Sequence, residues 1–139
     1  MWEIINYPII LQKELYTCGP ACIYMLCEYY HINYNKKKLL SQTKTSMKGT
    51  SIWYMQKALR YLGFTSNAVS IMNFCLYDYN FPTIALIQPH KNVFHYVIIY
   101  NRTGEILTIG DPAYGLNSVS VQDFIINFTG ILIIPTYKI

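Results

Sequence analysis

Side chains that could do chemistry are few in this sequence. Its 139 residues include seven carboxylates, three histidines and four cysteines, and charged residues make up only 13% of the chain. Cys18 stands out, because it follows a polar loop and precedes a predicted helix. The unpaired main-chain N–H groups and the dipole at a helix N-terminus favour a thiolate. This position therefore predicts a nucleophilic thiol at Cys18.

The other three cysteines are interpreted as structural. Cys22, Cys27 and Cys75 fall in apolar patterns, where cysteine usually fills space in a core. The sequence has no C-x-x-C pair and no histidine at zinc-finger spacing. It therefore predicts free thiols and no metal site.

His95 and Asp111 are expected to complete a catalytic site. His95 lies in the apolar segment 93–100, and a cysteine on a helix with a histidine on a strand is the arrangement of papain-like thiol enzymes. Asp111 ends the next apolar segment, and a turn at 101–104 makes the two segments antiparallel, which brings the carboxylate towards the imidazole. Taken singly, the histidine is more commonly a hydrogen-bonded core residue and the Asp-Pro pair an ordinary turn.

Gln12 is the candidate for an oxyanion site. It lies six residues before Cys18, and a side-chain amide at such a place can donate to a developing oxyanion, although a surface glutamine in a loop is ordinary. The two remaining histidines fit a catalytic role less well. His31 follows the first predicted helix, and His90 lies beside Pro89 in a predicted loop.

The elements that must position these residues change character halfway along the chain. After an extended arm at 1–11, apolar spacing predicts helices up to about residue 30 with Thr17 as N-cap, over about 36–42, and between 49 and 63. Runs rich in Ile, Val, Phe and Tyr predict strands at 81–88, 93–100, 106–109 and 131–134, with a short helix after Ser120. Helices followed by an antiparallel meander indicate an α+β fold in one domain, 1–139.

Composition narrows the class of protein. A net charge of +4 is too weak to argue for nucleic-acid binding, and Lys36–Lys38 is interpreted as the solvated start of a helix. The N-terminus lacks the features of a secretory signal, and no stretch reaches the ~20 apolar residues of a spanning helix, so we expect a soluble, cytosolic domain. Aromatic residues at 16% suggest either a partly apolar docking groove or simply a tyrosine-rich composition.

Four ordered motifs carry a resemblance to a known family. They are Gln12 with Cys18-Gly19-Pro20-Ala21-Cys22, the segment 94–100 around His95, Asp111-Pro112-Ala113-Tyr114-Gly115, and the segment 124–132. Together they resemble the bacteriocin-processing cysteine peptidase domain at the N-terminus of peptidase-containing ABC transporters. The resemblance covers nearly the whole chain, with Thr17 where members often have Asp and His31 where they often have Gly.

The resemblance implies a papain-like fold, with N-terminal helices packed on a C-terminal antiparallel sheet. It implies removal of the leader from bacteriocin, lantibiotic or pheromone precursors after a double-glycine-type site, coupled to export. The implied roles are nucleophile for Cys18, general base for His95, orienting acid for Asp111 and oxyanion donor for Gln12. No cofactor is expected in this domain, and ATP would act only in a separate nucleotide-binding domain.

The resemblance also implies partners and a location. The partners are a precursor with an amphipathic helical leader and the transmembrane and nucleotide-binding domains of an exporter, at the cytoplasmic side of the bacterial membrane. Trp53 and Tyr54 are candidates for contact with the leader, although Trp53 could equally belong to the core.

Two further alternatives stay open at this point. A non-catalytic docking module for transporter substrates would typically lack the cysteine, and an exported cell-wall amidase would need a signal sequence. The chain is either part of a longer exporter or a free-standing peptidase.

Overall fold

The computed structural model describes residues 6–71 and 80–137, and helices and strands separate along the chain as the change in apolar spacing predicts. The described helices are α1 (Cys18–Tyr29), α2 (Lys36–Thr43), α3 (Ile52–Tyr61) and α4 (Val121–Asn127). The strands are β1 (Phe64–Ser70), β2 (Thr83–His90), β3 (Val93–Thr103), β4 (Ile106–Asp111), β5 (Gly115–Ser120) and β6 (Phe128–Tyr137).

Side-chain caps begin three of the helices. The side-chain oxygens of Asn35, Ser51 and Ser120 accept hydrogen bonds from main-chain N–H groups in the first turns of α2, α3 and α4, which satisfies donors that have no partner inside a helix. Thr17 occupies the N-cap position of α1 as predicted, but its side chain does not cap the helix. Its hydroxyl donates instead to the main-chain oxygen of Glu14 (3.0 Å).

The sheet is antiparallel, but its order differs from a simple meander. Its strands lie in the order β1-β6-β2-β3-β4-β5, so β6 pairs on one side with β1 and on the other with β2. The edge strands β1 and β5 were absent from the sequence prediction. In addition, β2 extends through Pro89 and His90, which were predicted to lie in a loop.

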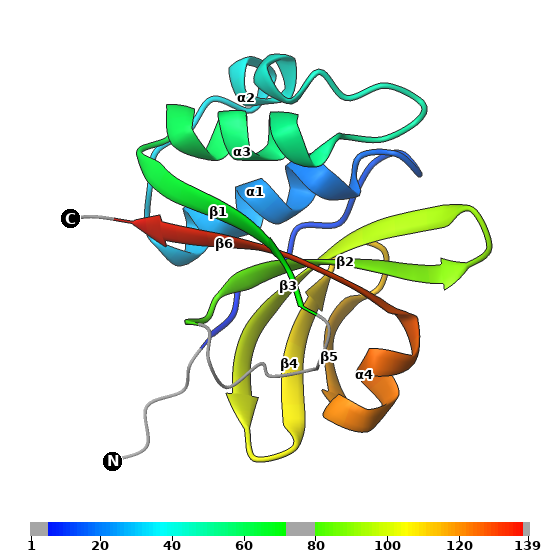
Figure 1. Ribbon diagram of the computed structural model, residues 1–139. Coiled ribbons are helices and arrows are strands. Elements are labelled where there is room, and N and C mark those ends of the chain that lie inside the picture. The colour runs from blue at the N-terminus through cyan, green and yellow to red at the C-terminus, as the bar shows by residue number, and fades with distance from the viewer. Residues whose placement is uncertain (1–5, 72–79, 138–139) are drawn as a thin grey trace, which may run out of the picture.

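Two apolar cores lie on the two faces of the sheet. The first joins α1, α2 and α3 to one face and includes Leu26, Met55 and Ile98. The second joins α4 to the other face and includes Ile99 and Phe124. Figure 1 shows α1, α2 and α3 on one side of the sheet and α4 on the other. None of the helices in the described residues has the length and apolar character needed to cross a membrane.

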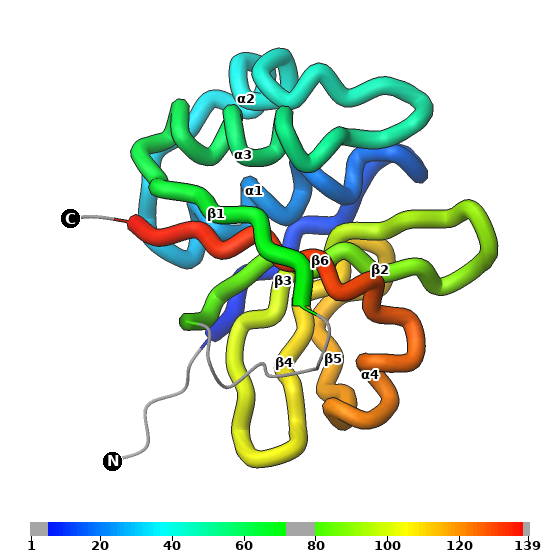
Figure 2. Tube along the Cα trace, in the orientation of Figure 1, coloured from blue at the N-terminus to red at the C-terminus, as the bar shows by residue number. Residues whose placement is uncertain are grey.

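The predicted extended arm at 1–11 is described only from residue 6 onwards, since residues 1–5 lie outside the described residues, and this part contacts the sheet. The Tyr100 hydroxyl donates to the main-chain oxygen of Pro8, and the rings of Tyr7 and Tyr100 stack with centroids 4.8 Å apart. Farther on, the Gln12 main-chain N–H donates to the main-chain oxygen of Pro112 (2.8 Å). In Figure 2 this blue segment passes behind β1 and β6 before it enters α1. These contacts place Gln12 beside the loop that follows Asp111.

Candidate active site

Cys18 is the first residue of α1, where the sequence predicts the nucleophile. Its side chain is buried, with 6% of the residue exposed. Gly19 lets the helix start pack tightly, because a Cβ at that position would lie 2.9 Å from Met55 Sδ and 3.0 Å from Thr50 Oγ1. The N-terminus of α1 thus packs closely against Thr50 and α3 through Gly19, and its unpaired N–H groups and dipole act on the thiol of Cys18.

His95 and Asp111 meet as the antiparallel strands predict. His95 Nε2 lies 2.7 Å from Asp111 Oδ1, and both side chains are largely buried. The same carboxylate oxygen accepts a hydrogen bond from the main-chain N–H of Ala113 (2.8 Å), which fixes its orientation. Because Asp111 occupies Nε2, the imidazole has Nδ1 left for Cys18. The three predicted residues are therefore brought together by α1, β3 and β4.

The surroundings of His95 stabilise its charged form. Burial by itself lowers the pKa of this imidazole, but hydrogen bonds to Asp111 and Cys18, together with the negative charge of both groups, outweigh burial and raise the pKa from 6.5 to about 9. His95 is therefore protonated at neutral pH. An imidazolium between a thiol and a carboxylate is the arrangement expected of a thiolate–imidazolium pair.

Tyr96 contacts Cys18, although the sequence did not identify it as a candidate. Its main-chain N–H donates to Cys18 Sγ (3.5 Å), and its hydroxyl donates to the main-chain oxygen of Thr50 (2.9 Å). Burial raises the pKa of the Tyr96 phenol well above its ordinary value, so the hydroxyl remains a donor. Its position next to His95 could have identified it, because a strand that brings a histidine to a cysteine also brings the neighbouring main-chain N–H close to that cysteine.

Gln12 lies near the site but does not point at Cys18 in this structure. Its side-chain Nε2 donates to the main-chain oxygens of Glu14 (2.8 Å) and Leu15 (3.1 Å). Its buried Oε1 has no hydrogen-bond partner among the described residues. The amide thus holds the loop that leads into α1, and its main chain is anchored beside Asp111 through Pro112.

The remaining described thiols behave as the sequence predicts. Cys22 and Cys27 are fully buried in the core under the helices, and both are free thiols. Burial and the nearby Cys18 and Asp111 raise the pKa of Cys22 well above its ordinary value, and burial together with Glu28 raises that of Cys27 to about 12. Both therefore stay protonated at neutral pH. Cys75 lies outside the described residues.

Other predicted residues lie away from this cluster. Trp53 and Tyr54 are on α3, where Trp53 is 59% exposed and so is not a core residue, and their rings contact edge to face at 4.9 Å. His31 and His90 are both exposed. His31 lies beyond the other end of α1, a helix about 16 Å long from Cys18 to Tyr29.

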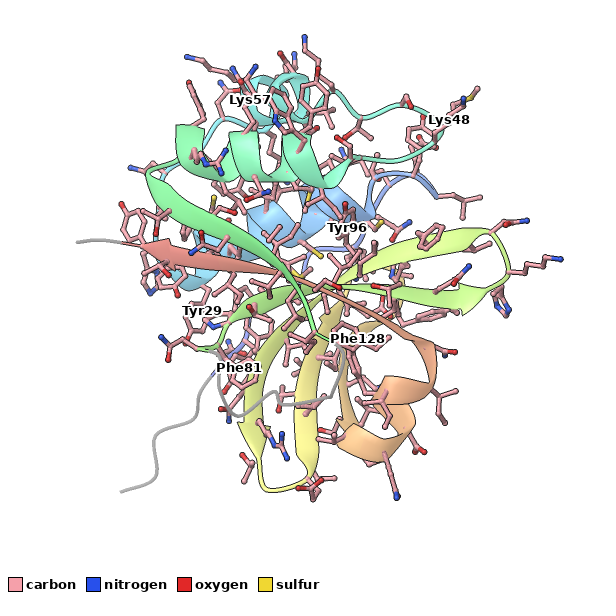
Figure 3. All side chains as sticks on the ribbon, in the orientation of Figure 1. Tyr29, Lys48, Lys57, Phe81, Tyr96 and Phe128 are labelled. Atoms are coloured by element: carbon pink, nitrogen blue, oxygen red, sulfur yellow. The ribbon has the colours of Figure 1, made fainter. Side chains whose placement is uncertain are left out.

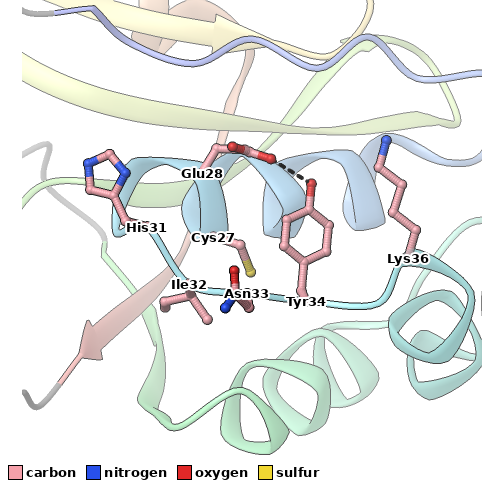
Figure 4. A pocket seen from close by; sticks show the side chains of 7 residues that line it. All are labelled: Cys27, Glu28, His31, Ile32, Asn33, Tyr34 and Lys36. Carbon is pink, nitrogen blue, oxygen red and sulfur yellow. Dashed lines mark hydrogen bonds between the residues drawn. The ribbon is translucent and has the colours of Figure 1, made fainter.

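A pocket of about 480 Å³ surrounds His31, but it is not the catalytic site. Figure 4 shows Tyr34 pointing across it, with its hydroxyl donating to Glu28 Oε1 (3.1 Å). None of Cys18, His95 and Asp111 lines it. The volume of this pocket, taken alone, would have pointed to the C-terminal end of α1, away from Cys18. Elsewhere, the described residues hold no group of three or more His, Cys, Asp or Glu side chains placed to bind a metal ion.

A thiol at a helix N-terminus, a strand histidine and a carboxylate on that histidine define the papain-like cysteine peptidases as the class of this fold and site. The model of the peptidase C39 family matches residues 6–138, and the chain belongs to this family.

Individual relatives agree with the family match. The chain is 31% identical over 132 residues to the lactococcin-G-processing and transport ATP-binding protein of Lactococcus lactis subsp. lactis, a match that covers 94% of this chain and 19% of that protein. The chain therefore spans about a fifth of the length of the first curated relatives it matches.

Solved structures show the same fold. The peptidase domain of Streptococcus ComA, described as a bi-functional ABC transporter involved in a quorum sensing pathway, has a TM-score of 0.85 and 27% identity, covering 96% of this chain and 100% of that one. A double glycine motif protease from an AMS/PCAT transporter, solved with its leader peptide, has a TM-score of 0.86 and 26% identity, covering 96% of this chain and 93% of that one. The predicted papain-like α+β fold is confirmed.

Proposed function

We propose that this chain is an endopeptidase that removes the leader from secreted precursor peptides after a double-glycine-type site. The observation that carries the proposal is the contact between His95 and Asp111 at 2.7 Å, with Cys18 on the other side of the imidazole. A non-catalytic docking module would have no need to keep a charged histidine beside a thiol at a helix N-terminus. The names of the relatives support the precursor as substrate.

The first half of the reaction is acylation. Cys18 and His95 start as a thiolate–imidazolium pair, and the thiolate attacks the carbonyl carbon of the second glycine. The tetrahedral intermediate then expels the amine of the mature peptide, which takes the proton from the His95 imidazolium. Asp111 keeps Nε2 of the ring engaged, so Nδ1 faces both Cys18 and the leaving amine. The leader remains attached to Cys18 as a thioester.

Hydrolysis of the thioester completes the cycle. Neutral His95 accepts a proton from water as the water attacks the acyl carbon, and the thiolate leaves with the imidazolium restored. Proton and bond changes balance among Cys18, His95, water and peptide. The proposed reaction needs no cofactor in this domain, and ATP would act only in a separate nucleotide-binding domain.

Gln12 is proposed as an oxyanion donor together with the main-chain N–H of Cys18. Supporting this role, Gln12 lies just before the helix and is anchored beside Asp111 through Pro112. Its longer hydrogen bond, to Leu15 at 3.1 Å, is the one that a bound oxyanion would replace. The bond to Glu14 would then hold the amide in place.

The leader is proposed to bind as an amphipathic helix on exposed apolar side chains. Trp53 and Tyr54 are the residues we propose for this contact, since Trp53 exposes 59% of a large aromatic surface. The chain is further proposed to serve as the N-terminal peptidase domain of an ABC exporter, at the cytoplasmic side of the bacterial membrane. Its partners there would be the transmembrane and nucleotide-binding domains, in keeping with the names of the relatives.

The test is cleavage of a synthetic leader-plus-core peptide with a Gly-Gly junction, followed by mass spectrometry. We expect one cut after the second glycine. Cys18→Ala should abolish it, whereas Cys22→Ala, one helical turn later, should retain it. Saturable binding without cleavage by both wild type and Cys18→Ala would instead identify a docking module.

A further inference from the structure

Charge is strongly segregated along this chain. No carboxylate occurs between Glu28 and Asp78. Seven of the eleven cationic residues lie in that interval: Lys36, Lys37, Lys38, Lys44, Lys48, Lys57 and Arg60. The modest net charge of +4 conceals this pattern, because the carboxylates are all in the remaining parts of the sequence. The proposed peptidase chemistry uses none of these seven residues.

The fold gathers the seven cations on one part of the surface. They lie on α2, on the connection 44–51 and on α3, and all seven are exposed. We call this part of the surface the cationic face. In Figure 1 it forms the end of the molecule remote from α4, and in Figure 3 the labelled Lys48 and Lys57 lie on its outer side. Neither of the two ion pairs found among the described residues involves it.

Exposed apolar side chains are interspersed with the cations. Met47 is 86% exposed and lies between Lys44 and Lys48 in the sequence. Tyr61 is about half exposed, and Lys38 Nζ lies 5.3 Å from the centre of its ring. A surface that combines lysines with an exposed methionine and tyrosine suits the boundary between lipid headgroups and acyl chains.

We propose that the cationic face binds the surface of an anionic membrane. Lysines near such a surface are attracted to its negative potential, and each adds to the affinity. Three of the cations, Lys36, Lys37 and Lys38, line described pockets beside α2. The other four, on the connection 44–51 and on α3, line none of these pockets, so they offer an open surface rather than a groove for an extended acidic peptide. Met47, next to Lys48 and 86% exposed, supplies apolar area that a purely electrostatic partner such as nucleic acid would not use. This binding uses none of the proposed catalytic residues, although Lys57 of the cationic face lies 5.2 Å from the ring of Trp53, which is proposed to contact the leader.

The experiment is co-sedimentation of the full chain with phosphatidylcholine vesicles, with and without phosphatidylglycerol. We expect binding at least about tenfold stronger with the anionic lipid, and weaker binding as salt screens the lysines. The triple substitution Lys37→Glu, Lys44→Glu and Lys48→Glu should abolish that preference. Met47→Ser should weaken binding about threefold at unchanged charge.

A matched pair of single substitutions distinguishes binding through the cationic face from a general effect of net charge. Lys48→Glu and Lys91→Glu change the charge equally, but Lys91 lies in the β2–β3 turn, outside the cationic face. We expect Lys48→Glu alone to weaken binding severalfold. Equal losses in the two variants, or equal binding to both kinds of vesicle, would overturn the proposal. So would tighter binding to polyglutamate or RNA that is insensitive to Met47→Ser. Circular dichroism and peptide cleavage, both expected to be unchanged, confirm that the variants fold.

Discussion

The main-chain N–H of Tyr96 donates to Cys18 Sγ across 3.5 Å, joining residues 78 positions apart in the chain. The strand that carries His95, the proposed base, therefore also contacts Cys18, the proposed nucleophile. The Tyr96 phenol secures that strand by donating to the main-chain oxygen of Thr50. Thr50 Oγ1 is itself hydrogen-bonded to Thr45 Oγ1 (2.6 Å) and lies next to the space left by Gly19. The geometry of the thiol is thus set by β3 and by the residues before α3, in addition to α1.

Tyr96→Phe should make Cys18 less reactive while leaving the triad side chains in place. Without the phenolic hydrogen bond, β3 is held less firmly and its N–H donates less well to the thiolate. We expect the rate of Cys18 alkylation by iodoacetamide at pH 7 to fall about threefold to tenfold, which corresponds to ~1 kcal/mol.

Tyr100→Phe is the matched control for this prediction. Tyr100 lies on the same strand, is equally buried, and also donates its hydroxyl to a main-chain oxygen, that of Pro8. It does not contact Cys18 in the described hydrogen bonds. We expect similar losses of thermal stability in the two variants but an unchanged rate of Cys18 alkylation in Tyr100→Phe. A fall of equal size in both variants would show that Tyr96 acts only through general stability.

Asp111→Asn should move the alkaline limb of peptide cleavage to lower pH. The raised pKa of His95, about 9, keeps the imidazolium available to protonate the leaving amine, and kcat/KM should fall above that pH. A neutral amide at position 111 removes the negative charge and weakens the hydrogen bond that raise this pKa. We expect the alkaline limb to move down by about one pH unit, measured with the synthetic precursor. An unmoved limb would mean that another group controls it.

The same ionisation predicts how stability depends on pH. The pKa of His95 is higher in the folded protein, about 9, than its ordinary value of 6.5. Its contribution to the free energy of unfolding is therefore complete below pH 6.5 and is lost as the pH rises towards 9. Urea unfolding at several pH values should show this loss in the wild type. Asp111→Asn should show a smaller loss over the same range, and an equal loss would contradict the assignment to His95.

Substitution of Gln12 tests whether its amide binds the oxyanion or only holds the loop. As an oxyanion donor, Gln12→Ala should lower kcat about 10²-fold to 10³-fold with little change in KM. Alkylation of Cys18 develops no oxyanion, so its rate should stay near that of the wild type. If alkylation falls as far as cleavage does, the bonds from Gln12 to Glu14 and Leu15 act by positioning Cys18 instead.

Most of the fold could be predicted from apolar spacing, and the two strands that were not predicted were missed for the same reason. Both missed strands, β1 and β5, lie at the edges of the sheet. Few of their side chains are buried, so neither strand needs the apolar run that revealed β2, β3, β4 and β6. The meander was wrong in part because the insertion of β6 between β1 and β2 is a long-range pairing. Local sequence patterns carry no information about such a pairing.

Residue type and position in the sequence predicted which side chains form the candidate site, but not which main-chain groups contribute to it. Cys18, His95 and Asp111 were identifiable because the sequence has few ionisable groups and because a turn joins β3 to β4. The hydrogen bond from the Tyr96 N–H could not be identified in this way, because every residue except proline carries the same main-chain donor. The hydrogen bonds of Gln12 to the loop were also beyond the sequence, because they depend on how residues 12–17 fold back before α1.

Trp53→Ala should raise KM more than it lowers kcat. In the proposed role, Trp53 contacts the leader and stays remote from the reacting carbonyl, so its loss weakens binding of substrate and transition state equally. We expect KM to rise about tenfold, as for loss of a large aromatic contact, with kcat within about twofold. Tyr61→Ala removes another exposed aromatic residue near the end of the same helix and serves as the control. An unchanged KM in Trp53→Ala would remove Trp53 from the leader site.

His31→Gly should stabilise the protein. The His31 N–H donates to the main-chain oxygen of Glu28 and the Ile32 N–H to that of Cys27, which together close α1 with a Schellman motif. His31 has a φ of 56°, a left-handed conformation that glycine adopts more readily. Relief of this conformation, less the greater chain entropy of glycine, predicts a gain of about 0.5–1 kcal/mol, measurable by urea unfolding. Asn33→Gly, at an exposed position without a positive φ, should lower stability instead. This opposite sign is what distinguishes relief of backbone strain from a general effect of glycine in the connection between α1 and α2.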